Sequence, residues 1–208
     1  MRVSMMVRWT SLAGIFGLVA ACSDAPTAAS SMADVAVTKD FQFSKVLSAT
    51  NFDIVPGKAT LVNVNGNYVY VPADALCAAG SGYGRDYFDK PCARETQPVS
   101  FSLIIGIDAK GDPLAAFNRD VRFSPDRAAY VILKAGSDAN RGRAILWWDP
   151  AQLKWVDEGS YDPQQKTYWS NDLVWRRVKH FSGYNINPYC DPSLDPSCGS
   201  SEAPPPSF

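Results

Sequence analysis

The chain has 208 residues, with 20 basic and 21 acidic side chains, one histidine and a formal net charge of −1. The charges are scattered, and no run of Lys and Arg forms the basic patch that nucleic-acid binding requires. Nucleic acid is therefore not expected as a partner. The length suits one domain with a sizeable core and flanking segments.

Residues 1–21 have the composition of a secretory leader. Residues 1–8 carry two positive charges, Arg2 and Arg8, and no acidic side chain. Residues 9–21 are an uncharged apolar run too short to span a bilayer. We expect this segment to be a signal peptide that is removed on export. No later apolar stretch is long enough to cross a membrane.

The end of the leader, Val19–Cys22, resembles the lipobox of bacterial lipoproteins. The resemblance implies that Cys22 is lipidated and anchors the chain in a membrane of the cell envelope, where each buried methylene contributes about 0.8 kcal/mol. Ser23 after the cysteine favours the outer membrane. The alternative is ordinary cleavage near Ala21, which leaves Cys22 as a free thiol.

The other cysteines are Cys77, Cys92, Cys190 and Cys198, an even number that is typical of two disulfides in an exported chain. Three pairings are open. We favour Cys77 with Cys92 and Cys190 with Cys198, because each pair encloses a loop rich in turn-forming residues. A metal site is the weaker alternative, since there is no C-x-x-C and a single histidine. No cofactor is expected.

Composition divides the exported chain into three parts. Residues 22–50 are dominated by Ala, Ser and Thr and are predicted to be a flexible tether. Residues 51–187 contain the strand-like apolar runs of a globular domain. Residues 188–208 are predicted to be a disulfide-closed loop followed by a Pro-rich disordered tail.

Short alternating or apolar runs bounded by turn residues predict the strands of this domain. We expect strands at residues 59–65, 68–71, 99–108, 121–123, 130–133 and 144–148. The Gly66-Asn67 step is predicted to turn the first of these into the second.

Two Asp-Pro steps, at residues 149–150 and 162–163, stand between aromatic arms and predict two successive hairpins. Residues 172–186 are predicted to be a closing strand and turn, whose imperfect alternation favours a bulge or an edge position. No segment has helical periodicity beyond one or two turns. The fold class is therefore all-β, an antiparallel β-sandwich.

Residues 121–133, 144–158 and 178–186 resemble, in that order, the second half of ZU-five-type domains. This β-sandwich module is shared by zonula occludens proteins, netrin receptors and ankyrins, with bacterial lipoprotein relatives. Residues 71–76 are similar to a turn in its first half. The family's glycine-rich opening strand is missing, and residues 77–92 look like an insertion.

The resemblance implies a spacer or protein-binding module in most members and a self-cleavage site in a few. The matching tripeptide is His180-Phe181-Ser182. In that reaction Ser182 attacks the carbonyl of Phe181, the acyl group moves from nitrogen to oxygen, and water hydrolyses the ester, with His180 as the base. It needs a strained turn, which Gly183 would permit, and a donor for the oxyanion.

The alternative is a structural role, which we favour. His180 then packs at the rim of the sandwich with its ring nitrogens satisfied by backbone. Ser182-Gly183 is only the turn after the strand, and Tyr184 closes the open end.

Five of the six tryptophans lie between residues 147 and 175. Trp147 and Trp148 point to opposite faces of a regular strand, so at least one is expected to be exposed and able to stack on a sugar ring. There is no G-x-S-x-G motif for hydrolysis of an external substrate. The favoured function is an envelope lipoprotein with a spacer or binding module and no conventional catalysis, its partner a protein or a glycan.

Overall fold

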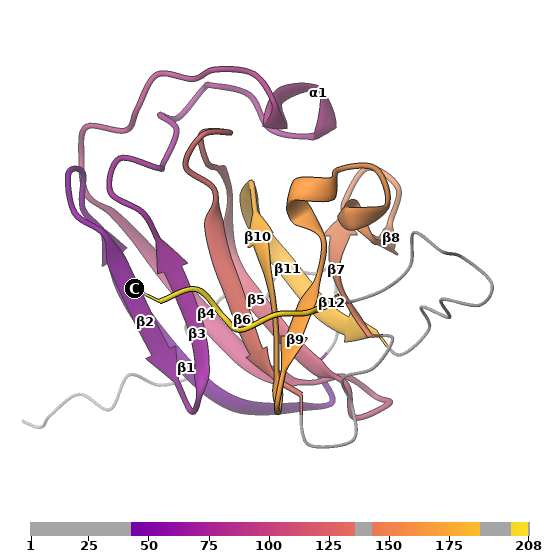
Figure 1. Cartoon of the computed structure of the whole chain (residues 1–208). Helices are drawn as coiled ribbons and strands as arrows, with labels where there is room; N and C mark the ends of the chain where they lie inside the picture. The colour runs from indigo at the N-terminus through magenta and orange to yellow at the C-terminus, as the bar shows by residue number, and fades with distance from the viewer. Residues whose placement is uncertain (1–42, 136–142, 188–200, 208) are drawn as a thin grey trace, which may run out of the picture. The chain divides into compact units, whose positions relative to one another are not determined.

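The computed structural model describes residues 43–135, 143–187 and 201–207. These residues form two six-stranded sheets that lie face to face (Figure 1) and share one apolar core. Every strand pair is antiparallel except β12 with β9. The predicted all-β sandwich is confirmed.

Sheet A has the strand order β1-β4-β5-β11-β7-β8, and sheet B has the order β12-β9-β10-β6-β3-β2. The strands of sheet A are β1 (Lys45–Ile54), β4 (Val99–Ile107), β5 (Pro113–Arg122), β11 (His180–Asn187), β7 (Ala144–Asp149) and β8 (Lys154–Val156). Those of sheet B are β12 (Ser201–Glu202), β9 (Tyr168–Ser170), β10 (Leu173–Val178), β6 (Ala129–Lys134), β3 (Asn67–Val71) and β2 (Thr60–Val64). The helical turns are α1 (Arg85–Phe88), η2 (Glu158–Ser160) and η3 (Pro163–Gln165).

The core follows from the two-residue period of the strands. In β6, Val131 and Leu133 point into the space between the sheets, and in β10 Val174 and Val178 do the same. The hairpin between β2 and β3 turns at Asn65-Gly66, both with positive φ, one residue before the predicted step.

Two strands of sheet A depart from the sequence prediction. β1 begins at Lys45, inside the predicted tether. The sequence does not predict this strand because it is a half-exposed edge strand with no clear apolar alternation. β5 begins at Pro113, well before the predicted start at Val121. Its residues Leu114–Phe117 are buried on both faces, so they show no alternation either.

The two Asp-Pro steps have different outcomes. Asp149-Pro150 makes the predicted turn between β7 and β8, closed by a 3.2 Å hydrogen bond from Gln152 N to Asp149 O. The prediction of a hairpin at Asp162-Pro163 is wrong. Asp162 instead caps the 3₁₀ turn η3, which buries Gln165, and β9 pairs with β10 and β12.

The predicted closing strand is two strands in different sheets, and neither is at an edge. β10 lies inside sheet B and β11 inside sheet A, so the chain crosses between the sheets at Lys179. The crossing explains the imperfect alternation of residues 172–186. An irregularity is also present, since Phe181 pairs with Val121 but Gly183 pairs with Ala116.

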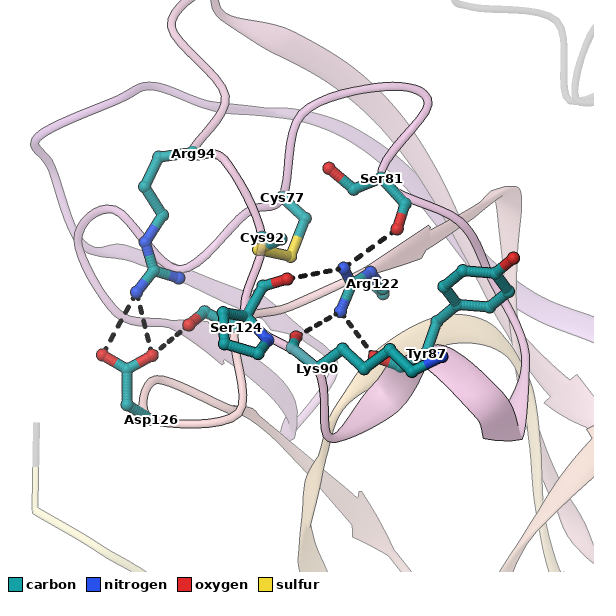
Figure 2. Close-up of a disulfide and its surroundings, with 10 residues drawn as sticks. Cys77, Ser81, Tyr87, Lys90, Cys92, Arg94, Arg122, Ser124 and Asp126 are labelled. Carbon is teal, nitrogen blue, oxygen red and sulfur yellow. Dashed lines mark hydrogen bonds and ion pairs between the residues drawn. A yellow bond between two sulfur atoms is a disulfide. The ribbon is translucent and has the colours of Figure 1, made fainter.

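The predicted disulfide between Cys77 and Cys92 is formed (Figure 2). Cys22 and the predicted pair Cys190–Cys198 lie outside the described residues.

The side chain of Arg122 organises the loop that this disulfide closes. Figure 2 shows its guanidinium between parts of the loop, where it donates to the backbone carbonyls of Ser81, Tyr87 and Lys90 at 2.9, 2.6 and 2.8 Å. A cation that satisfies several carbonyls at once fixes the path of a segment without secondary structure of its own.

Part of the predicted tail lies in a strand. Ser201–Glu202 form β12, which runs parallel to β9 at one edge of sheet B. No helix within residues 43–135, 143–187 and 201–207 is long and apolar enough to span a membrane.

Candidate functional site

The only histidine lies at the first position of β11, directly after the crossing between the sheets, and is fully buried. Its ring stacks on Phe88 at 4.1 Å between centroids and contacts the edges of Trp147 and Tyr83 at 4.7 and 5.7 Å. His180 is thus enclosed between β7 and the disulfide-closed loop. The predicted position at the rim is wrong, because the loop covers this end of the sandwich.

One ring nitrogen of His180 faces a buried carboxylate. Nε2 lies 2.8 Å from Oε1 of Glu158, and the guanidinium of Arg176 lies 2.7 Å from Oε2. Burial opposes ionisation of Glu158, but His180 and Arg176 outweigh it and hold the pKa of this carboxyl below its ordinary value. Because the carboxylate accepts, Nε2 is assigned the hydrogen.

The other ring nitrogen faces two tyrosines. Nδ1 lies 3.2 Å from the hydroxyl of Tyr83 and 3.4 Å from that of Tyr184, which also donates to the carbonyl of His180. Desolvation raises the pKa of both hydroxyls, so both stay protonated near neutral pH. Each hydroxyl has one hydrogen, and because Tyr184 donates its hydrogen to the carbonyl of His180, Tyr83 is the hydroxyl that can donate to Nδ1. Side chains, not the predicted backbone groups, therefore satisfy the histidine.

Sequence reasoning missed Glu158 and Arg176, although Arg176 carries a signal. It shares the inward parity of Val174 and Val178 in β10, and a charged side chain among core positions requires a buried partner of opposite charge.

The guanidinium of Arg176 is fixed from several elements. It donates to the carbonyl of Ile145 in β7 at 2.6 Å and to Oε1 of Gln165 at 3.3 Å. Gln165 is in turn held by the cap residue Asp162 at 3.1 Å. The Asp-Pro step thus serves to orient a buried amide toward Arg176.

Ser182, the predicted nucleophile, is hydrogen-bonded to Trp147 and not to His180. Its Oγ accepts from Nε1 of Trp147 at 2.8 Å, and the residue is only 5% exposed. The two nitrogens of His180 are directed at Glu158 and the tyrosines. Burial raises the pKa of Tyr83, and a hydrogen bond with Ser182 partly opposes that rise, so the Tyr83 hydroxyl interacts with both the serine and Nδ1 of His180.

A self-cleavage site at the Phe181–Ser182 peptide requires an oxyanion donor and a strained turn, and the structure has only the first of these. The Tyr83 hydroxyl lies 3.3 Å from the carbonyl oxygen of Phe181, where an oxyanion would form, and its single hydrogen can be donated either to this oxygen or to Nδ1 of His180. The expected strained turn is absent from this part of the chain. β11 runs through Gly183 as extended strand, and the described residues with positive φ lie elsewhere.

The adjacent tryptophans do point to opposite faces of β7, as predicted. Trp147 is 1% exposed and belongs to the core, so its proposed use as a sugar-stacking surface is wrong. Trp148 is half-buried on the outer face of sheet A, where its ring meets that of Trp155 at 5.4 Å.

In the described part of the chain, no group of three or more His, Cys, Asp or Glu side chains is placed to hold a metal ion. Comparisons with family models, with curated proteins and with solved structures find no match for this chain. The resemblance to ZU-five-type domains therefore remains a hypothesis that rests on the sequence motifs alone.

Proposed function

We propose that this chain is a lipid-anchored protein of the bacterial cell envelope, whose β-sandwich is a binding or spacer module without conventional catalysis. The observation that supports the proposal is the enclosure of its most reactive side chains. His180 and Glu158 are fully buried, and Ser182 is nearly so.

Enclosure matters because an external substrate must reach the reacting atoms. A general base must come within about 3 Å of the proton that it removes. Both nitrogens of His180 already face protein groups, and aromatic rings cover the remaining ring surface. The network thus stabilises the sandwich instead of serving a substrate.

Self-cleavage between Phe181 and Ser182 is the second candidate, because it needs no external substrate. The Tyr83 hydroxyl on the Phe181 carbonyl favours it. The serine proton would pass through Tyr83 to Nδ1 of His180 as Oγ attacks the carbonyl carbon. The protonated His180 would return this proton to the amide nitrogen, which leaves as the amine of Ser182, and water would hydrolyse the resulting ester.

Two features weigh against this candidate. The Trp147 N–H donates to Ser182 Oγ, which lowers the nucleophilicity of that oxygen. The backbone of β11 is extended, so no turn strain raises the energy of the amide. The non-catalytic role therefore remains the first proposal.

The intact mass of the exported chain from Ser23, measured in denaturant with and without reductant, decides between the two. We expect a single uncut chain. A fragment that begins at Ser182, and that disappears in both Ser182→Ala and Tyr83→Phe, would overturn the first proposal and establish the second.

A further inference from the structure

Four aromatic side chains form a continuous row on the outer face of sheet B. Tyr168 stacks on Trp175 at 4.6 Å, Trp175 meets Tyr130 at 6.1 Å, and Tyr130 meets Tyr70 at 6.3 Å between ring centroids. These residues come from β9, β10, β6 and β3, which are neighbours in the sheet. We call them the aromatic row.

This face is covered, although it points away from the core. Ile132 and Trp175 are paired across β6 and β10 and lie on the same outer face, because Val131 and Val174 beside them point inward. Ile132 is nevertheless 3% exposed and Trp175 8% exposed, and neither belongs to the core between the sheets. Outward apolar residues this well buried indicate a second layer over the sheet.

The second layer includes the chain's own C-terminal segment. β12 pairs with β9, and Ala203 N donates to the carbonyl of Trp169 at 3.0 Å. Nε1 of Trp175 donates to the carbonyl of Ala203 at 3.1 Å. Beyond this point Figure 1 shows the tail crossing in front of sheet B, and Pro205 and Pro206 are partly buried.

The sequence of this segment has the chemistry that such a surface recognises. Pro204–Pro206 have their φ preset and no N–H groups, so they favour the extended polyproline II helix, whose carbonyls are free to accept hydrogen bonds. Aromatic grooves bind this helix by packing rings against prolines, at a small cost in chain entropy. Trp175 supplies both the ring and the donor to a carbonyl.

We propose that the aromatic row is a binding surface for proline-rich segments in the polyproline II conformation, and that residues 203–206 occupy it in cis. The partner in trans is then a proline-rich polypeptide, which competes with the tail. This inference rests on the proposed role as a binding module and names its partner class.

Cis occupation has a measurable effect. A tethered segment presents itself at an effective concentration of about 1 mM when its linker is short and flexible. An external peptide of the same sequence, with a dissociation constant of about 0.1 mM, would then bind the full chain about tenfold more weakly than a chain without the tail.

The test compares the chain from Ser23 to Phe208 with the same chain ending at Ser200. The probe is a fluorescent peptide of sequence SEAPPPSF, titrated by anisotropy. We expect the shortened chain to bind the probe and the full chain to bind it about tenfold more weakly. In the shortened chain, Trp175→Phe should weaken binding about threefold to tenfold, because a neutral hydrogen bond is lost.

The matched control is Trp148→Phe in the shortened chain, since Trp148 lies on the outer face of the other sheet; its binding should not change. If the shortened chain does not fold, Pro204→Ser, Pro205→Ser and Pro206→Ser together in the full chain release the tail instead.

The proposal is overturned if the probe does not bind a folded chain whose aromatic row is uncovered. It is also overturned if the probe binds the full chain and the shortened chain equally well. Equal binding of a probe with Ala at the three proline positions also overturns it, because the strand pairing of β12 alone would then explain the contact. An uncut, membrane-anchored chain that binds no probe would leave the proposed envelope module standing without this partner class.

Discussion

The Glu158 carboxylate holds the buried polar network together, since it accepts from both His180 and Arg176. A buried ion pair contributes little net stability compared with an apolar pair, but the loss of one partner strands the other charge. Glu158 is therefore the residue in the site whose neutralisation should lower the stability of the fold most.

Glu158→Gln should lower the free energy of unfolding by about 3–5 kcal/mol, because it leaves the Arg176 guanidinium buried without a counter-charge. Urea denaturation of the exported chain at pH 7 measures the change. Asp172→Asn is the matched control, as it removes the exposed ion pair with Lys134 and should have little effect. Equal losses in the two variants would contradict the central role of Glu158.

The pH dependence of stability carries the same information. The pKa of Glu158 is lower in the folded chain than its ordinary value of 4.5, so the stability linked to it is fully present above that value. It is lost as the pH falls through the folded-state pKa. Asp108 and Asp162 also have lowered pKa values and contribute to the same acid limb.

The part due to Glu158 is isolated by comparison with Glu158→Gln. The difference in unfolding free energy between the two chains should shrink as the pH falls below about 4.5. A difference that stays constant down to pH 3 would mean that Glu158 does not titrate with folding.

The partners of His180 could not be predicted from the sequence. Glu158 and Tyr83 lie 22 and 97 residues from His180 in the chain, in a 3₁₀ turn and a loop that have no period to read. Short periodic patterns report the local direction of side chains, and they carry no information about which loop covers a strand end.

The disulfide-closed loop is the element that completes the site. It supplies Tyr83 and Phe88, which cover the histidine ring, and the Arg122 guanidinium donates to the loop's carbonyls. The loop thus links the redox state of Cys77 and Cys92 to the enclosure of His180.

Cys77→Ser with Cys92→Ser should lower the free energy of unfolding by about 2–4 kcal/mol, as expected when a loop with 15 residues of separation loses its crosslink. The released loop should also expose Trp147, which contacts Phe88 at 5.8 Å. Thermal unfolding and the tryptophan emission maximum measure the two effects. An unchanged spectrum with reduced stability would show that Arg122 alone retains the loop.

Strands with a clear alternation of apolar and polar residues, or with a turn signal beside them, could be predicted from the sequence. Strands that are buried on both faces, or exposed on both, could not be predicted. β4, β6 and β7 are close to their predicted bounds, whereas the Ala-rich centre of β5 and the half-exposed β1 gave no pattern. The Asp-Pro step at residue 162 had the sequence of a hairpin turn, but the need to bury Gln165 beside Arg176 decided its structure.

The proposed attachment of the molecule to a membrane rests on Cys22. Cys22→Ser should move the exported protein from the membrane fraction to the soluble fraction, because the acyl chains are lost and no protein segment of the described chain replaces them. Fractionation followed by immunoblotting measures this, with Ser30→Ala in the tether as the control. An unchanged membrane fraction would contradict lipidation at Cys22.

The fold class followed from composition and turns, but the strand order did not. β1 pairs with β4, and β11 inserts between β5 and β7, so both sheets depend on pairings between distant parts of the chain. Such pairings leave no mark in a short stretch of sequence.

The late strand β11 has a consequence for biogenesis. Until residue 187 has been synthesised, β1-β4-β5 and β7-β8 are separate fragments, and sheet A cannot close. Folding that waits for its most distant pairings is slow. On the proposed role as an exported protein, the chain passes a secretion channel before it folds, and this topology would keep the polypeptide competent for translocation until residue 187 has been synthesised.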